Sequence, residues 1–434
     1  MAIIKRQRYI DKLIRLRNNG QVKIITGIRR CGKSFLLNTL YRNYLLTHGV
    51  TSEQIIFLDL DDIQNNRYRN PLELDRYIRS VMKDNNLRYY VLLDEIQKVR
   101  SIVNPNLPDD SDEKIGFVDV LNGMKNIPNA DVYVTGSNSK MLSSDVATEF
   151  RGRGDVIQLS PLTYDEFFEA YEGDKHGAWR EFFTYGGMPG VMSLASHEDK
   201  AQYLTDLFRL IYLADVVERN NIKADIDVLD HLLNIVSSSV GSLTNPSRLS
   251  STFGTIKHLK IKNETISGYL DCFIDAFILS KAFRYDIKGR SHIETPLKYY
   301  FGDIGLRNAK INFRQQEENH IMENVLFNEL KARGFSIDIG MINHRWKDKE
   351  DKMRQTQLEV DFVVNKAEKR YYIQSALTVA DEDKRRQEVN SLNRIDDSYT
   401  KMVIVKDDIL PWTDERGIQY INIEDFLLKT INEL

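Results

Sequence analysis

The first third of the chain alternates short apolar runs with segments whose apolar residues recur at helical spacing. Short apolar runs are typical of buried parallel strands, and the spaced pattern is typical of amphipathic helices. The expected strands are "QVKIITG", "EQIIFLDL", "RYYVLLDEIQ", "ADVYVTGSN" and "GDVIQLSPL". The expected helices are "KSFLLNTLYRNYLLTHG", "PLELDRYIRSVMKD" and "IGFVDVLNGMKN", and the second begins at a proline. This alternation over residues 21–160 predicts an α/β fold with a three-layer sheet.

The rest of the chain shows other patterns. Residues 166–225 are aromatic-rich with helical spacing and predict a helical connector. Over 226–312, three short helices ("DVLDHLLNIVSSSVG", "NPSRLSSTFG", "KNETISGYLDCFIDAF") precede the strands "ILSKAFRYDIKG" and "TPLKYYFGD", a pattern that resembles a winged helix-turn-helix. Residues 313–434 predict a small α/β domain. The polar stretch 104–113 is expected to be a mobile loop.

Composition narrows the class of protein. The length of 434 residues indicates two or three domains. The net charge of −3 means that any contact with nucleic acid must come from a local basic patch. The two cysteines, Cys31 and Cys272, are far apart, which argues against a disulfide framework. The charged start lacks a signal peptide's apolar core, and no run reaches the ~20 apolar residues that span a bilayer. We therefore expect a cytoplasmic protein with no membrane partner.

The stretch "GIRRCGKS" matches G-x-x-x-x-G-K-[ST] between an expected strand and an expected helix. Backbone N–H groups of such a loop surround a phosphate, and the helix N-terminus adds partial positive charge. The glycines permit the tight turn, the lysine reaches the β/γ-phosphates and the serine binds Mg²⁺. The alternative is a simple glycine turn. The predicted binding set for the nucleotide is Gly27, Ile28, Arg29, Arg30, Cys31, Gly32, Lys33, Ser34 and Phe35, with Cys31 a bystander rather than a nucleophile.

A second candidate site lies at the end of the third expected strand. "YYVLLDEIQ" places Asp94 at the carboxyl end of a buried run, followed by Glu95. Asp94, together with Ser34, is predicted to hold Mg²⁺, and Glu95 to polarise the attacking water. The alternative is a strand end with two solvated acids.

Two weaker candidates follow the fourth strand. Ser137 or Asn138 in "VYVTGSNS" would orient water beside the γ-phosphate, unless this is an ordinary turn. Arg151 and Arg153 in "EFRGRGD" would neutralise transition-state charge on a neighbouring subunit's nucleotide, which requires a homo-oligomer. The alternative for both arginines is a surface position.

Five stretches together resemble the bacterial and archaeal AAA-type ATPases that carry a C-terminal restriction-endonuclease-like domain. They are "GIRRCGKS", "LLDEIQK", "VTGSNSKML", "FRGRGDVIQLSPLTYDEF" and "YGGMPGV". The resemblance covers nearly the whole chain. It implies a P-loop ATPase core over 1–165, the winged-helix segment, and a degenerate nuclease fold over 313–434. It also favours ATP as the nucleotide.

The nuclease pattern of that family is incomplete in this chain. Glu323 in "MENVLFNEL" and Asp361 in "EVDFVV" match the first two acidic positions, which would hold Mg²⁺. Gln374 and Ala376 in "YYIQSALTV" stand where Glu and Lys are expected. Because Ala cannot replace the Lys, we expect a fold that has lost metal-dependent cleavage.

The winged-helix segment carries a local basic cluster that suits contact with the phosphates of double-stranded DNA. Its members are Lys257, Lys260, Lys262, Lys281, Arg284, Lys288 and Arg290. A solvated charged face, or a winged helix that binds protein, is the alternative. Three functions follow: an ATP-hydrolysing switch or motor acting on DNA or a protein partner, a nucleotide-dependent binding module with negligible turnover, and an ATP-dependent nuclease, which Gln374 and Ala376 disfavour.

Overall fold

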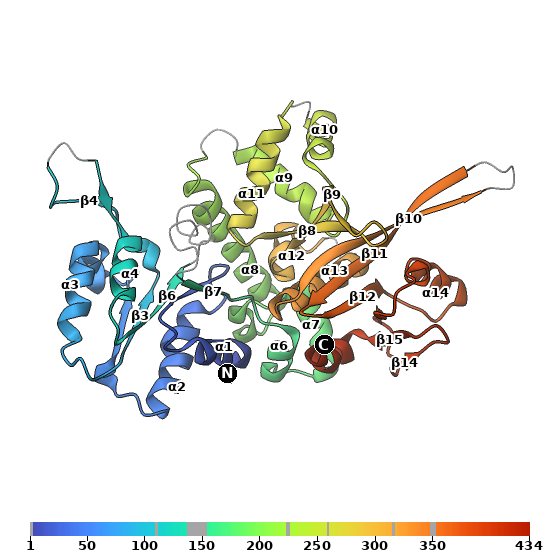
Figure 1. Ribbon diagram of the computed structural model, residues 1–434. Helices are drawn as coiled ribbons and strands as arrows, with labels where there is room; N and C mark the ends of the chain where they lie inside the picture. Colours follow the sequence, from blue (N-terminus) through green and yellow to red (C-terminus); the bar gives the residue numbers. More distant parts are fainter. Residues whose placement is uncertain are drawn as a thin grey trace. The chain divides into compact units, whose positions relative to one another are not determined.

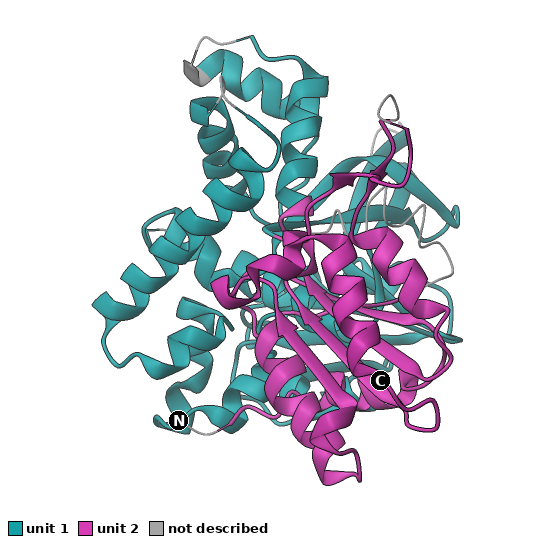
Figure 2. Cartoon of the chain, turned by 90° about the vertical axis from the view of Figure 1, so that its left-hand side faces the viewer, with its two compact units in different colours: residues 1, 161–274, 278–434 teal, residues 2–160, 275–277 magenta. Residues whose placement is uncertain are grey.

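The computed structural model describes residues 3–108, 112–136, 154–222, 226–257, 260–314, 317–347 and 353–434. The chain forms two compact units, which Figure 2 shows in different colours. In chain order, the first unit consists of residues 2–160 with 275–277 (magenta, unit 2 in the key of Figure 2). The second unit consists of residues 161–274 and 278–434 together with Met1 (teal, unit 1 in that key). No helix in the described part of the chain has both the length and the apolar character needed to cross a membrane.

The unit that contains residues 2–160 is built on a parallel five-stranded sheet with strand order β2-β3-β6-β1-β7 (Figure 1). Its strands are β1 (Val22–Thr26), β2 (Ile55–Asp59), β3 (Tyr89–Asp94), β6 (Ala130–Gly136) and β7 (Gly154–Gln158). Its main helices are α1 (Gln7–Leu16), the π-helical η1 (Phe35–Tyr41), α2 (Arg42–Thr47), α3 (Pro71–Val81) and α4 (Phe117–Lys125). All five strands expected from the apolar runs are present.

Helices cover both faces of this sheet. On one face, Leu74 and Ile78 of α3 and Leu121 of α4 pack into a cluster with alternate strand residues such as Val91 and Leu93. On the other face, Tyr41 of η1 hydrogen-bonds to Tyr133 of β6, with the two hydroxyl oxygens 2.6 Å apart. The predicted three-layer α/β fold is therefore confirmed for this unit.

Local sequence explains where α3 starts. The Asn70 side chain accepts hydrogen bonds from the backbone N–H groups of Leu72 and Glu73, and Pro71 occupies the first turn. The polar stretch 104–113 lies between two short strands. It is closed by an antiparallel pair, β4 (Ile102–Val103) and β5 (Lys114–Ile115).

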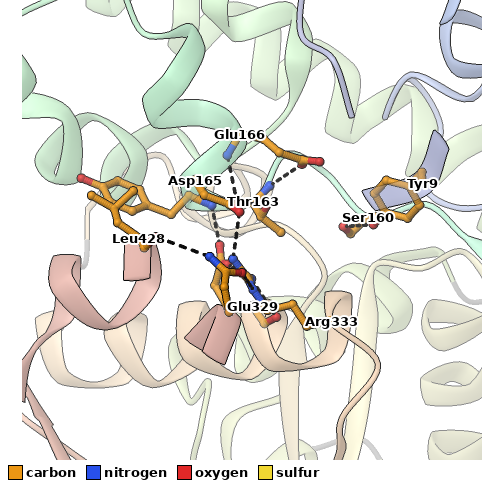
Figure 3. Close-up of polar contacts among 10 residues, drawn as sticks. Tyr9, Ser160, Thr163, Asp165, Glu166, Glu329, Arg333 and Leu428 are labelled. Carbon is orange, nitrogen blue, oxygen red and sulfur yellow. Dashed lines mark hydrogen bonds and ion pairs between the residues drawn. The ribbon is translucent and has the colours of Figure 1, made fainter. Parts of the chain in front are cut away.

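The motif "FRGRGDVIQLSPLTYDEF" supplies structural contacts on either side of residue 160. The Ser160 hydroxyl lies 2.6 Å from that of Tyr9, which fixes α1 to the chain after β7. In the other unit, the Glu329 carboxylate accepts a hydrogen bond from the backbone of Tyr164 at 2.6 Å and pairs with Arg333. Arg333 also forms an ion pair with Asp165, with a nitrogen–oxygen distance of 3.2 Å. Figure 3 shows these side chains together.

The second unit begins with helices and ends in a mixed eight-stranded sheet. Its helices are α6 (Tyr164–Ala170), α7 (Ala178–Tyr185), α8 (His197–Ile211) with a π-helical extension (Tyr212–Glu218), α9 (Ile226–Ser238), α10 (Pro246–Lys257), α11 (Asn263–Asp275), α12 (Ile304–Lys310), α13 (Glu318–Ala332), α14 (Glu382–Glu388) and a C-terminal helix of three short pieces (Ile423–Asp425, Phe426–Thr430 and Ile431–Glu433). The strands are β8 (Leu279–Asp286), β9 (Ser291–Phe301), β10 (Ser336–Lys347), β11 (Met353–Lys366), β12 (Lys369–Ala376), β13 (Thr400–Val405), β14 (Trp412–Thr413) and β15 (Ile418–Asn422).

The β8–β9 hairpin belongs to this large sheet. Three helices do precede the hairpin, as the pattern predicted, and β8 pairs antiparallel with β9. However, β8 also pairs in parallel with β10, with Arg284 opposite Ile339 and Asp286 opposite Met341. The sheet order is β14-β15-β13-β12-β11-β10-β8-β9, so the sheet runs without a break across the boundary expected at residue 312.

The motif "YGGMPGV" lies where segments of the backbone come into close contact. The Asp303 carboxylate accepts hydrogen bonds from the backbone N–H groups of Gly187 at 2.7 Å and Leu306 at 3.0 Å. A Cβ atom on Gly187 would lie 2.2 Å from the carbonyl oxygen of Leu162, and one on Gly305 would lie 1.9 Å from that of Tyr185. Side chains therefore have no room at these glycines, which hold α7 and α12 together.

Candidate functional site

The loop between β1 and η1 has the backbone of a phosphate-binding turn. Gly27, Arg30 and Gly32 have φ angles of 149°, 63° and 101°. A Cβ atom on Gly27 would lie 2.2 Å from the carbonyl oxygen of Leu159, whereas one on Gly32 would meet no atom within 4 Å. Gly27 is thus required by a close approach to the chain after β7, and Gly32 is favoured by its positive φ.

Lys33 is a buried cation with neutral partners in this loop. Its Nζ donates hydrogen bonds to the carbonyl oxygens of Gly27 and Ile28, each at 3.0 Å, and the residue is only 4% exposed. Charged acceptors bind an ammonium more strongly than carbonyl groups do. Lys33 is therefore suited to exchange these bonds for phosphate oxygens.

Asp94 and Ser34 meet beside the loop. The Ser34 side chain hydrogen-bonds to the Asp94 carboxylate, and the Thr135 hydroxyl donates to Asp94 Oδ1. Burial and the neighbouring Asp59 raise the pKa of Asp94, while these two hydrogen bonds and Lys33 oppose the rise. A hydroxyl and a carboxylate at one strand end are hard oxygen ligands, which fit Mg²⁺. When bound, Mg²⁺ would neutralise charge on the β- and γ-phosphates.

Glu95 is held in an uncommon backbone conformation directly after β3. Its φ is 55°, and its backbone N–H donates to the hydroxyl of Thr135 at 3.0 Å. Gln97 Nε2 donates to Glu95 Oε2. Burial raises the pKa of the Glu95 carboxyl, Lys33 opposes this and Asp94 adds to it. A carboxylate with a raised pKa beside a phosphate loop is suited to accept a proton from water.

Thr135 is a residue that the sequence reasoning missed. It lies on β6, between β3 and β1 in the sheet, and its hydroxyl joins the Asp94 side chain to the Glu95 backbone. The signal was a threonine just before the glycine of "VTGSNS", a stretch in which only Ser137 and Asn138 were considered. Ser137, Asn138, Arg151 and Arg153 lie outside the described residues.

The other residues of the loop differ in exposure. Arg29 is half-buried and lowers the pKa of Glu95, so it lies near that carboxylate. Arg30 is exposed, and Phe35 is 42% exposed at the start of η1. Cys31 is buried with its thiol directed to the carbonyl of Leu159, at 3.6 Å. Both Cys31 and Cys272 are free thiols.

A second polar cluster lies in the other unit, where the nuclease-like site was expected. Glu323 on α13 and Asp361 on β11 are 5% and 8% exposed. Asp361 Oδ2 accepts a hydrogen bond from the backbone of Ser375 at 2.7 Å, and its own N–H donates to Gln374 Oε1 at 3.4 Å. Ala376 ends β12 and is buried.

Lys298 of β9 provides the cation for this cluster, which the sequence reasoning did not find. Its Nζ lies 2.8 Å from Glu323 Oε1 and 2.6 Å from Glu359 Oε1, and the residue is 3% exposed. Tyr300, also on β9, donates its hydroxyl to the same Glu323 oxygen at 2.5 Å. The signal was a single lysine inside the apolar strand "TPLKYYF".

The charges in the cluster depend on one another. Burial alone would lower the pKa of Lys298, but the carboxylates of Glu323, Asp361 and Glu359 raise it above its ordinary value. Burial would raise the pKa of Glu323, yet Lys298 holds it below its ordinary value. Burial and the nearby Glu323 raise the pKa of Asp361 well above its usual range. Among the residues that the structure describes, no group of three or more His, Cys, Asp and Glu side chains is arranged to hold a metal ion.

The basic cluster expected on the hairpin is only partly exposed. Arg284 is 5% exposed and hydrogen-bonds to Gln357 Oε1 at 3.1 Å, so its proposed contact with DNA phosphates is wrong. The cause is the parallel pairing of β8 with β10, which covers this strand. Lys281, Lys288 and Arg290 remain exposed.

The fold and the loop of residues 27–34 define a P-loop domain of the AAA type, since residues 19–168 match the family model described as an AAA domain. Residues 176–317 match a second model, described as a domain of unknown function.

The chain is also similar to whole proteins. An uncharacterized protein of Haemophilus influenzae is 31% identical over 433 residues, which cover 99% of each chain. The chain therefore belongs to the same family as that protein. An uncharacterized protein of Methanocaldococcus jannaschii is 27% identical over 98% of this chain and 90% of its own. Among solved structures, a Walker-type ATPase of Pyrococcus abyssi is 14% identical with a TM-score of 0.46, covering 71% of this chain and 96% of that one.

Proposed function

We propose that this protein binds ATP with Mg²⁺ and hydrolyses it, and that it works as an AAA-type switch or motor on DNA or on a bound protein partner. One observation supports this above the others: Lys33, Ser34, Asp94 and Glu95 come together at the carboxyl ends of β1 and β3. These groups supply a phosphate ligand, two oxygen ligands for the metal and a base. In open α/β sheets, ligands bind at this edge.

The proposed mechanism assigns one task to each side chain. Lys33 exchanges its bonds to the Gly27 and Ile28 carbonyls for the β- and γ-phosphates. Ser34 and Asp94 hold Mg²⁺, which requires the Asp94 carboxylate to be ionised. Glu95 takes a proton from the attacking water. Thr135 fixes the distance between metal ligand and base, because its hydroxyl contacts both residues.

The second candidate is a nucleotide-dependent binding module with negligible turnover. The hydrogen bond from Gln97 to Glu95 favours it, because a carboxylate already engaged by a side-chain donor is less able to polarise water. In this case ATP would hold one conformation, and an activating partner would be needed to free Glu95. An active nuclease is disfavoured further, because Lys298 engages Glu323 and Glu359 where a metal would be needed.

Phosphate release with ATP and Mg²⁺ tests the proposal, in wild type and Glu95→Gln, each with and without duplex DNA. Glu73→Gln is the matched control, because Glu73 is an exposed carboxylate on α3 of the same unit that pairs with Arg76. We expect turnover in wild type and in the control, and ATP binding without turnover in Glu95→Gln. A rate that responds to duplex DNA would favour DNA as the partner, and an indifferent rate would favour a protein.

Other outcomes discriminate among the candidates. ATP binding without hydrolysis in wild type would favour the binding module. Equal turnover in wild type and Glu95→Gln would remove Glu95 from the role of base. Metal-dependent nicking of plasmid DNA by the purified protein would revive the nuclease. A strictly monomeric, fully active enzyme in light scattering would exclude Arg151 and Arg153 as residues acting on a neighbouring subunit.

A further inference from the structure

A cavity of about 950 Å³ is lined by residues of α14 and of the β14–β15 pair. Figure 1 labels these elements, and β14 and β15 form one edge of the eight-stranded sheet. We call this cavity the α14 cavity. The lining side chains used in this argument are Arg385, Asn390, Arg394, Trp412, Arg416 and Tyr420. Its volume is within the range of about 300–1,000 Å³ typical of ligand sites. The P-loop lies in the other compact unit, so this is a separate site.

Three of the arginines in the α14 cavity have no acidic partner. Arg386 pairs with Glu382. By contrast, Arg385, Arg394 and Arg416 form no ion pair with any carboxylate in the described part of the chain. Two other carboxylates line the cavity, Asp414 and Glu415, and Asp414 is engaged by the backbone N–H groups of Arg416 and Ile418. Arg394 hydrogen-bonds to neutral groups, Asn390 Oδ1 at 3.2 Å and a ring nitrogen of His344 at 3.3 Å. Guanidinium groups that line a hollow without a carboxylate partner indicate an anionic ligand.

Aromatic rings lie beside these guanidinium groups. Trp412 stacks on Tyr420 with ring centres 4.1 Å apart and an angle of 3° between the planes. The Arg385 guanidinium lies 5.9 Å from the centre of the Trp412 ring. Trp412 still exposes 38% of its surface. An exposed indole next to arginines that form no ion pair is the combination on which nucleic-acid bases stack.

A second cavity, of about 540 Å³, continues this surface and shares Arg394 with the first. Arg370 lies there between two aromatic rings, 5.4 Å from the centre of Tyr285 and 5.5 Å from that of Tyr399. Lys288 and Arg290, at the tip of the β8–β9 hairpin, line the same cavity. The exposed charge of the hairpin therefore contributes to this surface, which is longer than one nucleotide site.

We propose that the two cavities joined at Arg394 bind single-stranded nucleic acid, with bases against Trp412 and Tyr399 and phosphates against Arg385, Arg394 and Arg370. Alternation of aromatic rings and guanidinium groups matches the repeat of base and phosphate along a strand. A duplex keeps the faces of its bases stacked inside, so it could not use the rings. The proposal does not depend on ATP hydrolysis, because the site is separate from the P-loop.

Fluorescence anisotropy of the full chain without nucleotide tests this, with labelled oligothymidylate and oligouridylate of about 16 nucleotides. Trp412→Ala should weaken binding about fivefold or more, because it removes a stacking platform. Arg394→Ala should weaken binding and lower the slope of log K against log salt by about 0.7, the loss of one phosphate contact. Lys384→Ala is the matched control: it removes one positive charge from α14, but Lys384 does not line the cavity, so binding should change less than twofold.

Circular dichroism shows whether each variant folds. Arg416→Ala offers a further variant, because Arg416 is exposed and has no ion pair that its removal could disturb. Preference for either the deoxyribose or the ribose strand supports the proposal. The proposal would be overturned by an absence of binding at low salt, or by equal losses of affinity in Lys384→Ala and Arg394→Ala. It would also be overturned if duplex DNA or polyglutamate competed as well as the single strand, because the surface would then bind anions without recognising bases.

Discussion

Lys298→Met tests whether the cluster of Glu323, Glu359 and Asp361 depends on its internal cation. The change keeps an unbranched side chain and removes the ammonium group. Lys298 and Glu323 are 3% and 5% exposed, so the ion pair between them is buried. Removing one partner of a buried pair costs about 3–5 kcal/mol, because the other charge is left uncompensated. An exposed pair contributes only about 0–1 kcal/mol.

The structure supplies a matched control and a specific probe. Lys281 lies on the neighbouring strand β8, 3.9 Å from Asp271, and both side chains are exposed, so Lys281→Met should cost less than about 1 kcal/mol. All three tryptophans, Trp179, Trp346 and Trp412, belong to the same unit as Lys298. Urea unfolding followed by tryptophan fluorescence therefore reports the free energy of unfolding of this unit.

The pH dependence gives a second measure. Lys298 holds the pKa of Glu323 below its ordinary value, so this stabilisation is present above the pKa of an unfolded Glu and is lost as the pH falls through the folded pKa. In Lys298→Met the pKa of Glu323 should rise. The loss in free energy of unfolding caused by Lys298→Met should thus be largest at neutral pH and become smaller on acidification. The double variant Lys298→Met/Glu323→Gln should recover part of the loss at neutral pH. A neutral-pH loss under 1 kcal/mol, or no recovery in the double variant, would refute the reasoning.

Three further predictions concern the P-loop unit. Lys33→Ala should abolish ATP binding in calorimetry, because it removes the buried phosphate ligand; undiminished binding would overturn the assignment. Gly27→Ala should lower the thermal unfolding temperature in circular dichroism far more than Gly20→Ala, since both φ angles are positive but only the first Cβ would clash with a carbonyl, and equal shifts would contradict this. Because burial raises the pKa of Glu95 in the free protein, kcat/KM should fall on acidification at a higher pH than an ordinary glutamate would cause, and a fall confined to the ordinary range would count against Glu95 as the base.

Local patterns in the sequence were sufficient to predict the strands and the glycine-rich loop of the P-loop unit. Apolar runs marked its five strands, and the spacing of glycines, Lys33 and Ser34 located the loop, since strand, turn and helix each depend on a few consecutive residues. Asp94 and Glu95 could be placed because they end a buried strand. The sequence does not indicate that β3 pairs with β6, so the contact with Thr135 was not predicted.

The second unit was harder to predict because its arrangement depends on pairs far apart in sequence. The hairpin of β8 and β9 was expected, but nothing within it indicates that β10 would pair with β8 and bury Arg284. Similarly, Ala376 stands where the nuclease pattern would have a lysine, and its neighbours in sequence give no sign of a substitute. A lysine from β9 reaches the same acids, and only the folded sheet brings Lys298 to Glu323.

The parallel pairing of β8 with β10 also has a consequence for synthesis of the chain. Strand β10 begins at Ser336, fifty residues after β8 ends at Asp286. At about 5–20 residues per second, the ribosome needs roughly 3 to 10 s to make that stretch. For this time after β8 is made, its β10-facing edge has no partner, and an unpaired edge readily accepts a foreign strand. Slow translation between these strands should therefore increase aggregation of the nascent chain and its dependence on chaperones.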